Sequence, residues 1–164
     1  MSDYLKIAAA VVLPNLGGFA SATVMKKEPM TWYDTLKKPW WTPPRAAFAP
    51  VWTTLYATMG YSSYLVWRDG GGFQGDALVP LCAYGASLAL NWVWSPVFFG
   101  MKKMGLSVAI IIAYGGVTGV TTYLFHPINR TASMLLFPLL GWISLASSVN
   151  IYTWLYNREA AKAE

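Results

Sequence analysis

The side chains that acid–base or nucleophilic catalysis needs are almost absent from the apolar parts of this sequence. His126 is the only histidine and precedes Pro127, and no base stands beside the serine and threonine hydroxyls. His126 could serve as an axial haem ligand, but a turn residue at a helix end is the simpler interpretation. Cys82 is the only cysteine, so no disulfide forms within the chain, and we expect it to be free and buried in a helix. We therefore expect no metal site and no resident cofactor.

Asparagine and tryptophan side chains are better candidates, and the chemistry they favour is ligand binding. Six small, polar or aromatic residues lie inside long uncharged stretches, roughly 9–16 Å from the stretch ends that face residues 26–45, counting 1.5 Å per helical residue. They are Asn15, Asn91, Asn150, Trp52, Trp94 and Ala146. Polar residues gathered at one depth indicate a cavity, although hydrogen bonds between helices would also explain the asparagines.

Five uncharged stretches are the elements that position these residues. They cover residues 7–25, 46–67, 77–101, 104–125 and 131–157. Each is long enough to cross a hydrocarbon core of roughly 30 Å as a helix. A soluble helical domain would instead place charges on the outer face of every helix. The sequence therefore predicts an all-α bundle of five transmembrane helices that forms one membrane domain over residues 1–164.

The first stretch has an alternative interpretation as a signal peptide. Lys6, the apolar residues 7–13 and the small residues 20–22 have the order of such a peptide and its cleavage site. Asp3 beside a single lysine argues against it, and cleavage would leave four spans. We expect the first stretch to be retained.

The basic residues predict how the bundle is oriented. Lys6, Arg68 and Arg130 lie on one side of the membrane. The other side carries Lys26, Lys27, Lys37, Lys38, Arg45, Lys102, Lys103, Arg158 and Lys162. By the positive-inside rule, the first loop (residues 26–45) and the C-terminus should be cytosolic. The basic residues are split among short loops at the membrane edge, so we expect contact with membrane lipid and not with nucleic acid.

The first loop reads KKEPMTWYDTLKKPWWTPPR and is unusually aromatic for a linker. Thr31 followed by Asp34 fits a capping box, which predicts a short amphipathic helix with Trp32 and Leu36 on one face. Pro39 should end that helix. The segment either closes over the bundle as a lid or lies in the interface with its aromatic rings at headgroup level.

Several aromatic and proline-rich motifs follow one another along the chain. They are residues 14–19 (PNLGGF), 38–44 (KPWWTPP), 49–56 (APVWTTLY), 88–100 (LALNWVWSPVFFG) and 142–150 (WISLASSVN). In this order and spacing, the chain resembles the translocator protein family, the tryptophan-rich sensory proteins or peripheral-type benzodiazepine receptors. The resemblance covers essentially the whole chain, and residues 63–67 (SYLVW) resemble the animal branch.

The resemblance implies a five-helix bundle in the mitochondrial outer membrane that binds cholesterol, porphyrins and isoquinoline or benzodiazepine-type drugs. The family's drug pocket lies beneath the first loop. Carried over to this sequence, and with Tyr33 added from that loop, its lining would be Ala22, Met25, Tyr33, Phe48, Ala49, Trp52, Asn91, Trp94, Trp142, Ala146 and Val149.

Two departures from the family pattern bear on ligands. Leu106 stands where vertebrate members have a pocket tryptophan, so we expect reduced drug affinity. The family's cholesterol motif is out of register, because its tyrosine and arginine positions hold Ile151 and Leu155. A shifted version, Val149, Tyr152 and Arg158, still fits the loose pattern for cholesterol contact, and an interfacial aromatic with a topogenic cation would look the same.

Two classes of function follow from the resemblance. One is a binding and transfer protein for cholesterol and porphyrin or haem-type ligands. The other is a slow enzyme that degrades porphyrins with light and oxygen through Trp52 and Trp142. The lack of acids, bases and metal ligands favours the first. Gly115 and Gly119 form a GxxxG pattern, which fits helix association within the chain or in a homodimer.

Overall fold

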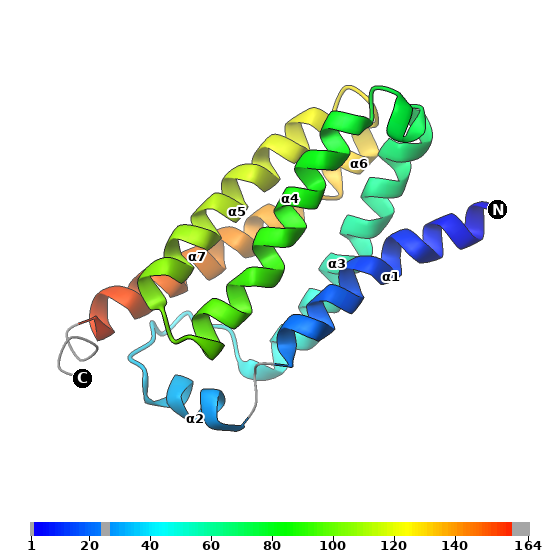
Figure 1. Ribbon diagram of the computed structural model, residues 1–164. Coiled ribbons are helices and arrows are strands. Elements are labelled where there is room, and N and C mark those ends of the chain that lie inside the picture. The colour runs from blue at the N-terminus through cyan, green and yellow to red at the C-terminus, as the bar shows by residue number, and fades with distance from the viewer. Residues whose placement is uncertain (1, 24–26, 159–164) are drawn as a thin grey trace.

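The chain folds into a bundle of helices, and residues 2–23 and 27–158, which the computed structural model describes apart from the side chains of 27–29, contain no strand. The long helices are α1 (Asp3–Ala22), α3 (Arg45–Asp69), α4 (Leu78–Ser95), α5 (Met104–Phe125) and α7 (Phe137–Asn157). The shorter elements are α2 (Lys27–Thr35), the 3-10 turn η1 (Gly72–Gln74), the π-helical turn η2 (Pro96–Gly100) and α6 (Arg130–Met134). Figure 1 shows α2 across one end of the bundle and α6 at the other. The all-α prediction is confirmed.

Within the part of the chain that the structure describes, three helical segments are long and apolar enough to cross a membrane. They are Asp3–Ala22, Met104–Phe125 and Arg130–Asn157, the last of which joins α6 and α7. α3 and α4 are also long, with 25 and 18 residues, but they are not among these three segments. The prediction of five spans therefore stays a prediction.

Proline residues explain where the helices depart from the predicted stretches. The third stretch continues past Ser95 only as η2, because Pro96 has no N–H to donate and changes the hydrogen-bond ladder. The fifth is divided between α6 and α7 just before Pro138 for the same reason. The first helix begins at Asp3 and not at residue 7, because charged residues are tolerated in its outermost turn. It ends at Ala22.

Helices α1 and α3 approach each other closely. They form one of the three most extensive helix contacts in the bundle, together with the α4–α5 and α5–α7 contacts. At the first of these pairs, a Cβ added to Gly60 would lie 2.2 Å from the Ala10 carbonyl oxygen and 2.6 Å from the Val11 Cα. Only glycine permits the backbones to approach so closely. Phe125, Met59 and Leu139 fill the centre with side chains that are completely buried.

The outward faces of the helices are apolar, whereas many hydroxyl groups are buried. Phe19 and Tyr123 are 71% and 79% exposed, but Ser62 and Thr118 are 0% and 1% exposed. The buried hydroxyls donate to backbone carbonyls, as Thr118 does to Tyr114 at 2.7 Å. This distribution suits a lipid solvent. Cys82 is free as predicted, but the expectation that it is buried is wrong, because it lies on an exposed face of α4.

The two ends of the bundle are distinct. At one end the first loop is tied to α7, since the Lys37 backbone N–H and C=O both bond the Asn157 side-chain amide at 3.0 Å. At the other end the Lys6 ammonium lies over the Trp67 ring, and Asn129 donates to Asp69 at 2.6 Å. Hydrogen bonds from Arg68 and then Asn129 hold the pKa of Asp69 below its ordinary value.

Candidate ligand-binding cavity

A cavity of about 580 Å³ lies beneath the first loop. All five long helices line it, and Tyr33, Lys38 and Pro43 border it from the loop. This volume falls within the range of about 300–1,000 Å³ that is typical of small-molecule sites. The fold therefore encloses a space of useful size at the depth where the sequence predicts a cavity.

The predicted ligand-binding residues meet at this cavity. Of the eleven, Met25 lies outside the described residues. The other ten all line the cavity: Ala22, Tyr33, Phe48, Ala49, Trp52, Asn91, Trp94, Trp142, Ala146 and Val149. Asn15 and Asn150, predicted at the same depth, border it as well. What these residues bind stays a prediction.

Aromatic rings form one wall of the cavity. The Trp52 ring stacks on Tyr56 with ring centroids 5.4 Å apart and stands perpendicular to Trp142 at 6.5 Å. Phe48 meets the other side of Trp142 edge-on at 5.8 Å. Rings in such contacts fix one another's orientation. The wall therefore presents preformed aromatic faces and edges to a ligand.

Asn91 and Asn150 line the cavity and also join helices, whereas Asn15 lines it and bonds Val11 of its own helix, so both interpretations hold in part. The Trp94 indole donates to Asn150 at 2.9 Å, and the Asn150 amide donates to Ser107 at 3.1 Å. The Tyr56 hydroxyl donates to Asn91 at 2.5 Å. These bonds connect α3 with α4, and α7 with α4 and α5. They hold the cavity walls in place.

Two buried donors at the cavity have no hydrogen-bond partner among the described residues. They are the Tyr114 hydroxyl and the Trp142 indole N–H. Both residues line the cavity, and Tyr114 is only 2% exposed. Unpartnered buried donors are uncommon in folded proteins, and a ligand or a water that accepts from them would satisfy them. Sequence reasoning missed Tyr114; a single phenol in the middle of an aliphatic stretch was the available signal.

The first loop contributes its aromatic residues unequally. Tyr33 and Trp32 pack on the rings of η2, with Tyr33 5.5 Å from Phe99 and Trp32 5.6 Å from Phe98. The Trp41 indole donates to Ser148 on α7 at 3.1 Å. Trp40 is 92% exposed and faces away from the bundle. The loop therefore covers the cavity with Tyr33 and leaves the Trp40 ring exposed, and the place of that ring at the headgroup level stays a prediction.

The predicted capping box in this loop is wrong. α2 begins at Lys27, so Thr31 and Asp34 both lie inside the helix and not at its start. Pro29 falls in the first turn, where the missing N–H costs nothing, so the helix can begin before Thr31. The predicted amphipathic face does form, because Trp32 and Leu36 both pack on the cluster of Phe98, Phe99 and Met104.

Comparison with known proteins agrees with this architecture. The sequence profile of the TspO/MBR family matches residues 10–155. The chain belongs to the TspO/MBR family. It is 43% identical over 147 residues to the translocator protein of Bos taurus, covering 90% of this chain and 87% of the relative. It is 41% identical over 144 residues to that of Homo sapiens, with coverage of 88% and 85%.

A bacterial relative is nearly as similar. The tryptophan-rich sensory protein of Cereibacter sphaeroides is 35% identical over 148 residues, which cover 89% of this chain and 90% of that protein. The predicted resemblance is thus confirmed, and identity is higher to the bovine and human proteins than to this bacterial one. Family membership and the apolar helices together identify a multi-pass membrane protein.

Leu106 and the shifted cholesterol motif are the departures from the family pattern. Leu106 lies outside the cavity, and the residues of the motif contact different neighbours. Leu106 is 48% exposed and is not among the residues that line the cavity. Of the shifted cholesterol motif, Val149 lines the cavity, whereas Tyr152 stacks on Tyr156 at 4.2 Å. The Arg158 guanidinium lies 6.0 Å from the Trp154 ring centroid. The three side chains have different neighbours, and their role in binding cholesterol stays a prediction.

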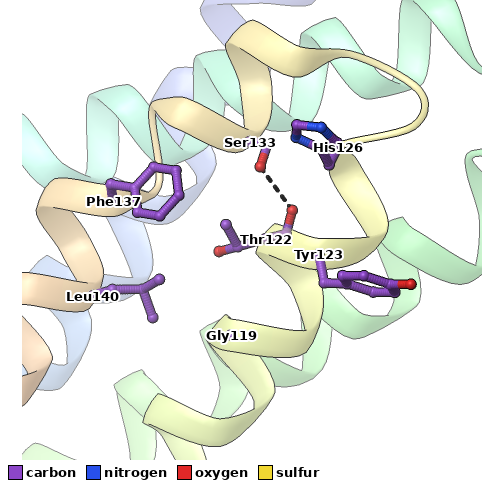
Figure 2. A pocket seen from close by; sticks show the side chains of 7 residues that line it. All are labelled: Gly119, Thr122, Tyr123, His126, Ser133, Phe137 and Leu140. Carbon is purple, nitrogen blue, oxygen red and sulfur yellow. Dashed lines mark hydrogen bonds between the residues drawn. The ribbon is translucent and has the colours of Figure 1, made fainter.

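A second, shallower pocket of about 330 Å³ opens at the α6 end of the bundle. Figure 2 shows the seven residues that line it: Gly119, Thr122, Tyr123, His126, Ser133, Phe137 and Leu140. The Ser133 hydroxyl donates to the Thr122 carbonyl at 2.9 Å, so this polar group is already satisfied by the protein. His126 caps the end of α5, which agrees with its interpretation as a turn residue.

Proposed function

We propose that this protein binds flat, largely apolar molecules in the cavity beneath the first loop. The expected ligands are cholesterol, porphyrin and haem-type molecules and isoquinoline or benzodiazepine-type drugs. The observation that carries the proposal is the aromatic wall of Trp52, Trp142 and Phe48 in a cavity of about 580 Å³. A tetrapyrrole presents a flat π-face to such a wall, and each aromatic contact contributes about 0.5–1.5 kcal/mol beyond burial.

Tryptophan fluorescence tests the proposal directly. Protoporphyrin should quench the emission of the purified protein, and the double variant Trp52→Ala with Trp142→Ala should bind about tenfold more weakly or worse, since two such contacts are lost. Trp40→Ala is the matched control, because Trp40 is 92% exposed and does not line the cavity. Unchanged affinity in the double variant would place the site elsewhere.

Degradation of porphyrins is the second candidate function. The rings of Trp52 and Trp142 both line the cavity with centroids 6.5 Å apart, so one bound ligand would contact two oxidisable indoles. Illumination of the protein with protoporphyrin in oxygen, followed by product analysis, separates the candidates. Product formation that needs both tryptophans supports the enzyme. Porphyrin consumed equally by the double variant supports binding alone.

We also propose how the protein sits in the cell. It forms one membrane domain of five spans in the mitochondrial outer membrane, with the first loop and the C-terminus in the cytosol, and takes part in the transport or sensing of sterols and tetrapyrroles. The excess of basic residues at the loop end of the bundle supports this orientation. Homodimerisation would fit Gly119, around which no protein atom lies within 4 Å of an added Cβ, while Gly115 already packs on Ile143.

A further inference from the structure

The charged residues that line the cavity all lie at its mouth. Of the described lining residues, only Asp34, Lys38 and Arg45 are charged, and all come from the first loop or the first residue of α3. The remaining lining is aromatic, aliphatic or neutral and polar. The cavity thus has an apolar interior and an ionic entrance.

The charges at this entrance are not balanced. Arg45 forms an ion pair with Asp34. Lys38 has no ion pair among the side chains that the structure describes, and its ammonium group donates to the backbone carbonyls of Tyr33 and Leu36 at 2.6 and 3.3 Å. The same group lies 4.3 Å from the centroid of the Tyr33 ring. One positive charge therefore remains at the mouth, held next to a ring that lines the cavity.

Lys38 is positioned to accept an anionic partner. An ammonium group has three donors, and the two carbonyls use two of them. Burial lowers the pKa of Lys38, and the nearby Asp34 carboxylate, which is paired with Arg45, offsets this only in part. An anion at the mouth would stabilise the charged form of Lys38. Hydrogen bonds between charged groups are stronger than those between neutral groups.

We propose that Lys38, with Arg45 beside it, binds a carboxylate of a flat apolar acid whose body occupies the aromatic cavity. Among the ligands proposed above, this contact at Lys38 would favour acidic tetrapyrroles over their neutral esters and over sterols. This inference rests on the proposed binding function and names the polar half of the same site. The tryptophan wall binds the ring, and the mouth binds the acid group at the level of the lipid headgroups.

A simpler role for Lys38 is that of one more basic residue on the loop side of the membrane. Lys103 provides the matched comparison, because it lies on the same side and is exposed but does not line the cavity. Lys38→Met and Lys103→Met remove the same charge from the same membrane surface. Any difference between them in ligand affinity reports contact at the mouth and not the general attraction of anions.

The experiment titrates the full-length protein, in vesicles of neutral phosphatidylcholine, with protoporphyrin and with its dimethyl ester, which has the same ring and no carboxylate. Wild type and Lys103→Met should bind the acid about tenfold or more tightly than the ester, because a charge-assisted bond is lost in the ester. Lys38→Met should lose this preference by weakening the acid alone. Undiminished ester binding shows that the variant is folded.

Equal affinity of wild type for acid and ester, or equal behaviour of Lys38→Met and Lys103→Met, would overturn the inference and leave the binding function intact. If neither porphyrin binds, or the Trp52→Ala, Trp142→Ala double variant binds both as wild type does, the proposed function itself is wrong.

Discussion

At the scale of single residues, two buried tyrosines form a natural pair for experiment. Among the described residues, the hydroxyls of Tyr84 and Tyr114 make no direct hydrogen bond, although each lies near a polar side chain, Ser63 and Asn91 respectively. Only Tyr114 lines the cavity. The two phenols therefore share their chemistry and burial and differ in access to a ligand.

We predict that Tyr114→Phe weakens binding of a carbonyl-bearing benzodiazepine-type drug by roughly threefold to tenfold, the value of one hydrogen bond of about 0.5–1.5 kcal/mol. Tyr84→Phe should leave affinity unchanged. Both variants should retain thermal stability, because neither hydroxyl bonds the protein. Competition binding with the purified protein measures the affinities. Equal affinities in the two variants would show that the Tyr114 hydroxyl does not contact the ligand.

Ten of the residues that line the cavity were predicted from the sequence, but Tyr114 and the charged mouth were missed. Nine of the ten were placed by the resemblance to the family, because a family motif carries position along with residue type. The inward face of α5 carries hydroxyls at helical spacing (Ser107, Tyr114, Thr118 and Thr122), a pattern that hydrophobicity alone does not reveal because the rest of the helix is apolar. Tyr114 and the packing of Lys38 on Tyr33 follow from helix rotation and loop path, which depend on contacts between distant segments.

At the scale of helices, the contact between α1 and α3 depends on Gly60. We predict that Gly60→Ala lowers the free energy of unfolding by about 1–3 kcal/mol, because the new methyl group would meet the backbone of Ala10 and Val11 and force the helices apart. Gly85→Ala is the control, since nothing lies within 4 Å of a Cβ at that position of α4. Thermal unfolding in detergent should show a lower midpoint for the first variant only. A midpoint equal to that of wild type would mean that the close approach is absent.

If the first loop covers the cavity, a bound ligand should reduce the opening motions of its backbone. Asn157 bonds both backbone groups of Lys37, and Tyr33 packs on Phe99 above the cavity. We predict that a bound drug slows hydrogen exchange of the amides from Thr31 to Trp41, and that Asn157→Ala speeds it without drug because the tie to α7 is lost. Amides in the middle of α5 serve as the internal reference. The same exchange rates with and without drug would favour a loop that rests only in the membrane interface.

The sequence predicts which segments are helical but not the residues at which the helices begin and end. Particular residues show the physical reasons. Uncharged stretches exclude charged residues by definition, whereas α1 begins at Asp3 and includes Asp3 and Lys6. Pro138 ends one hydrogen-bond ladder and starts another, so a single stretch becomes α6 and α7. The start of α2 at Lys27 depends on a first turn that tolerates Pro29, and the capping pattern at Thr31 competes with it.

At the scale of the whole molecule, the bundle has a basic end that carries the first loop and an opposite end that carries Asn129. Asn129-Arg130-Thr131 is an acceptor sequence for N-glycosylation. In a secretory membrane of the proposed orientation this loop would face the lumen, but in the mitochondrial outer membrane it faces the intermembrane space, which holds no glycosylation machinery. The Asn129 side chain also caps α6 at 2.7 Å and donates to Asp69, so the fold already uses it.

We therefore predict that protein purified from its native cells has an unmodified Asn129 and keeps Lys6 on an uncleaved N-terminus, as intact-mass spectrometry would show. An Asn129 glycan, or a chain that begins at Thr23, would overturn the mitochondrial assignment. Because the engaged side chain and the nearby bilayer also disfavour a glycan, protease access supplies the deciding measurement. On intact mitochondria, added protease should cut the C-terminal tail that carries Arg158 and Lys162 and spare the loop at 126–130. The reverse pattern of cleavage would invert the proposed orientation, since the tie between Lys37 and Asn157 keeps the first loop and the end of α7 on one side.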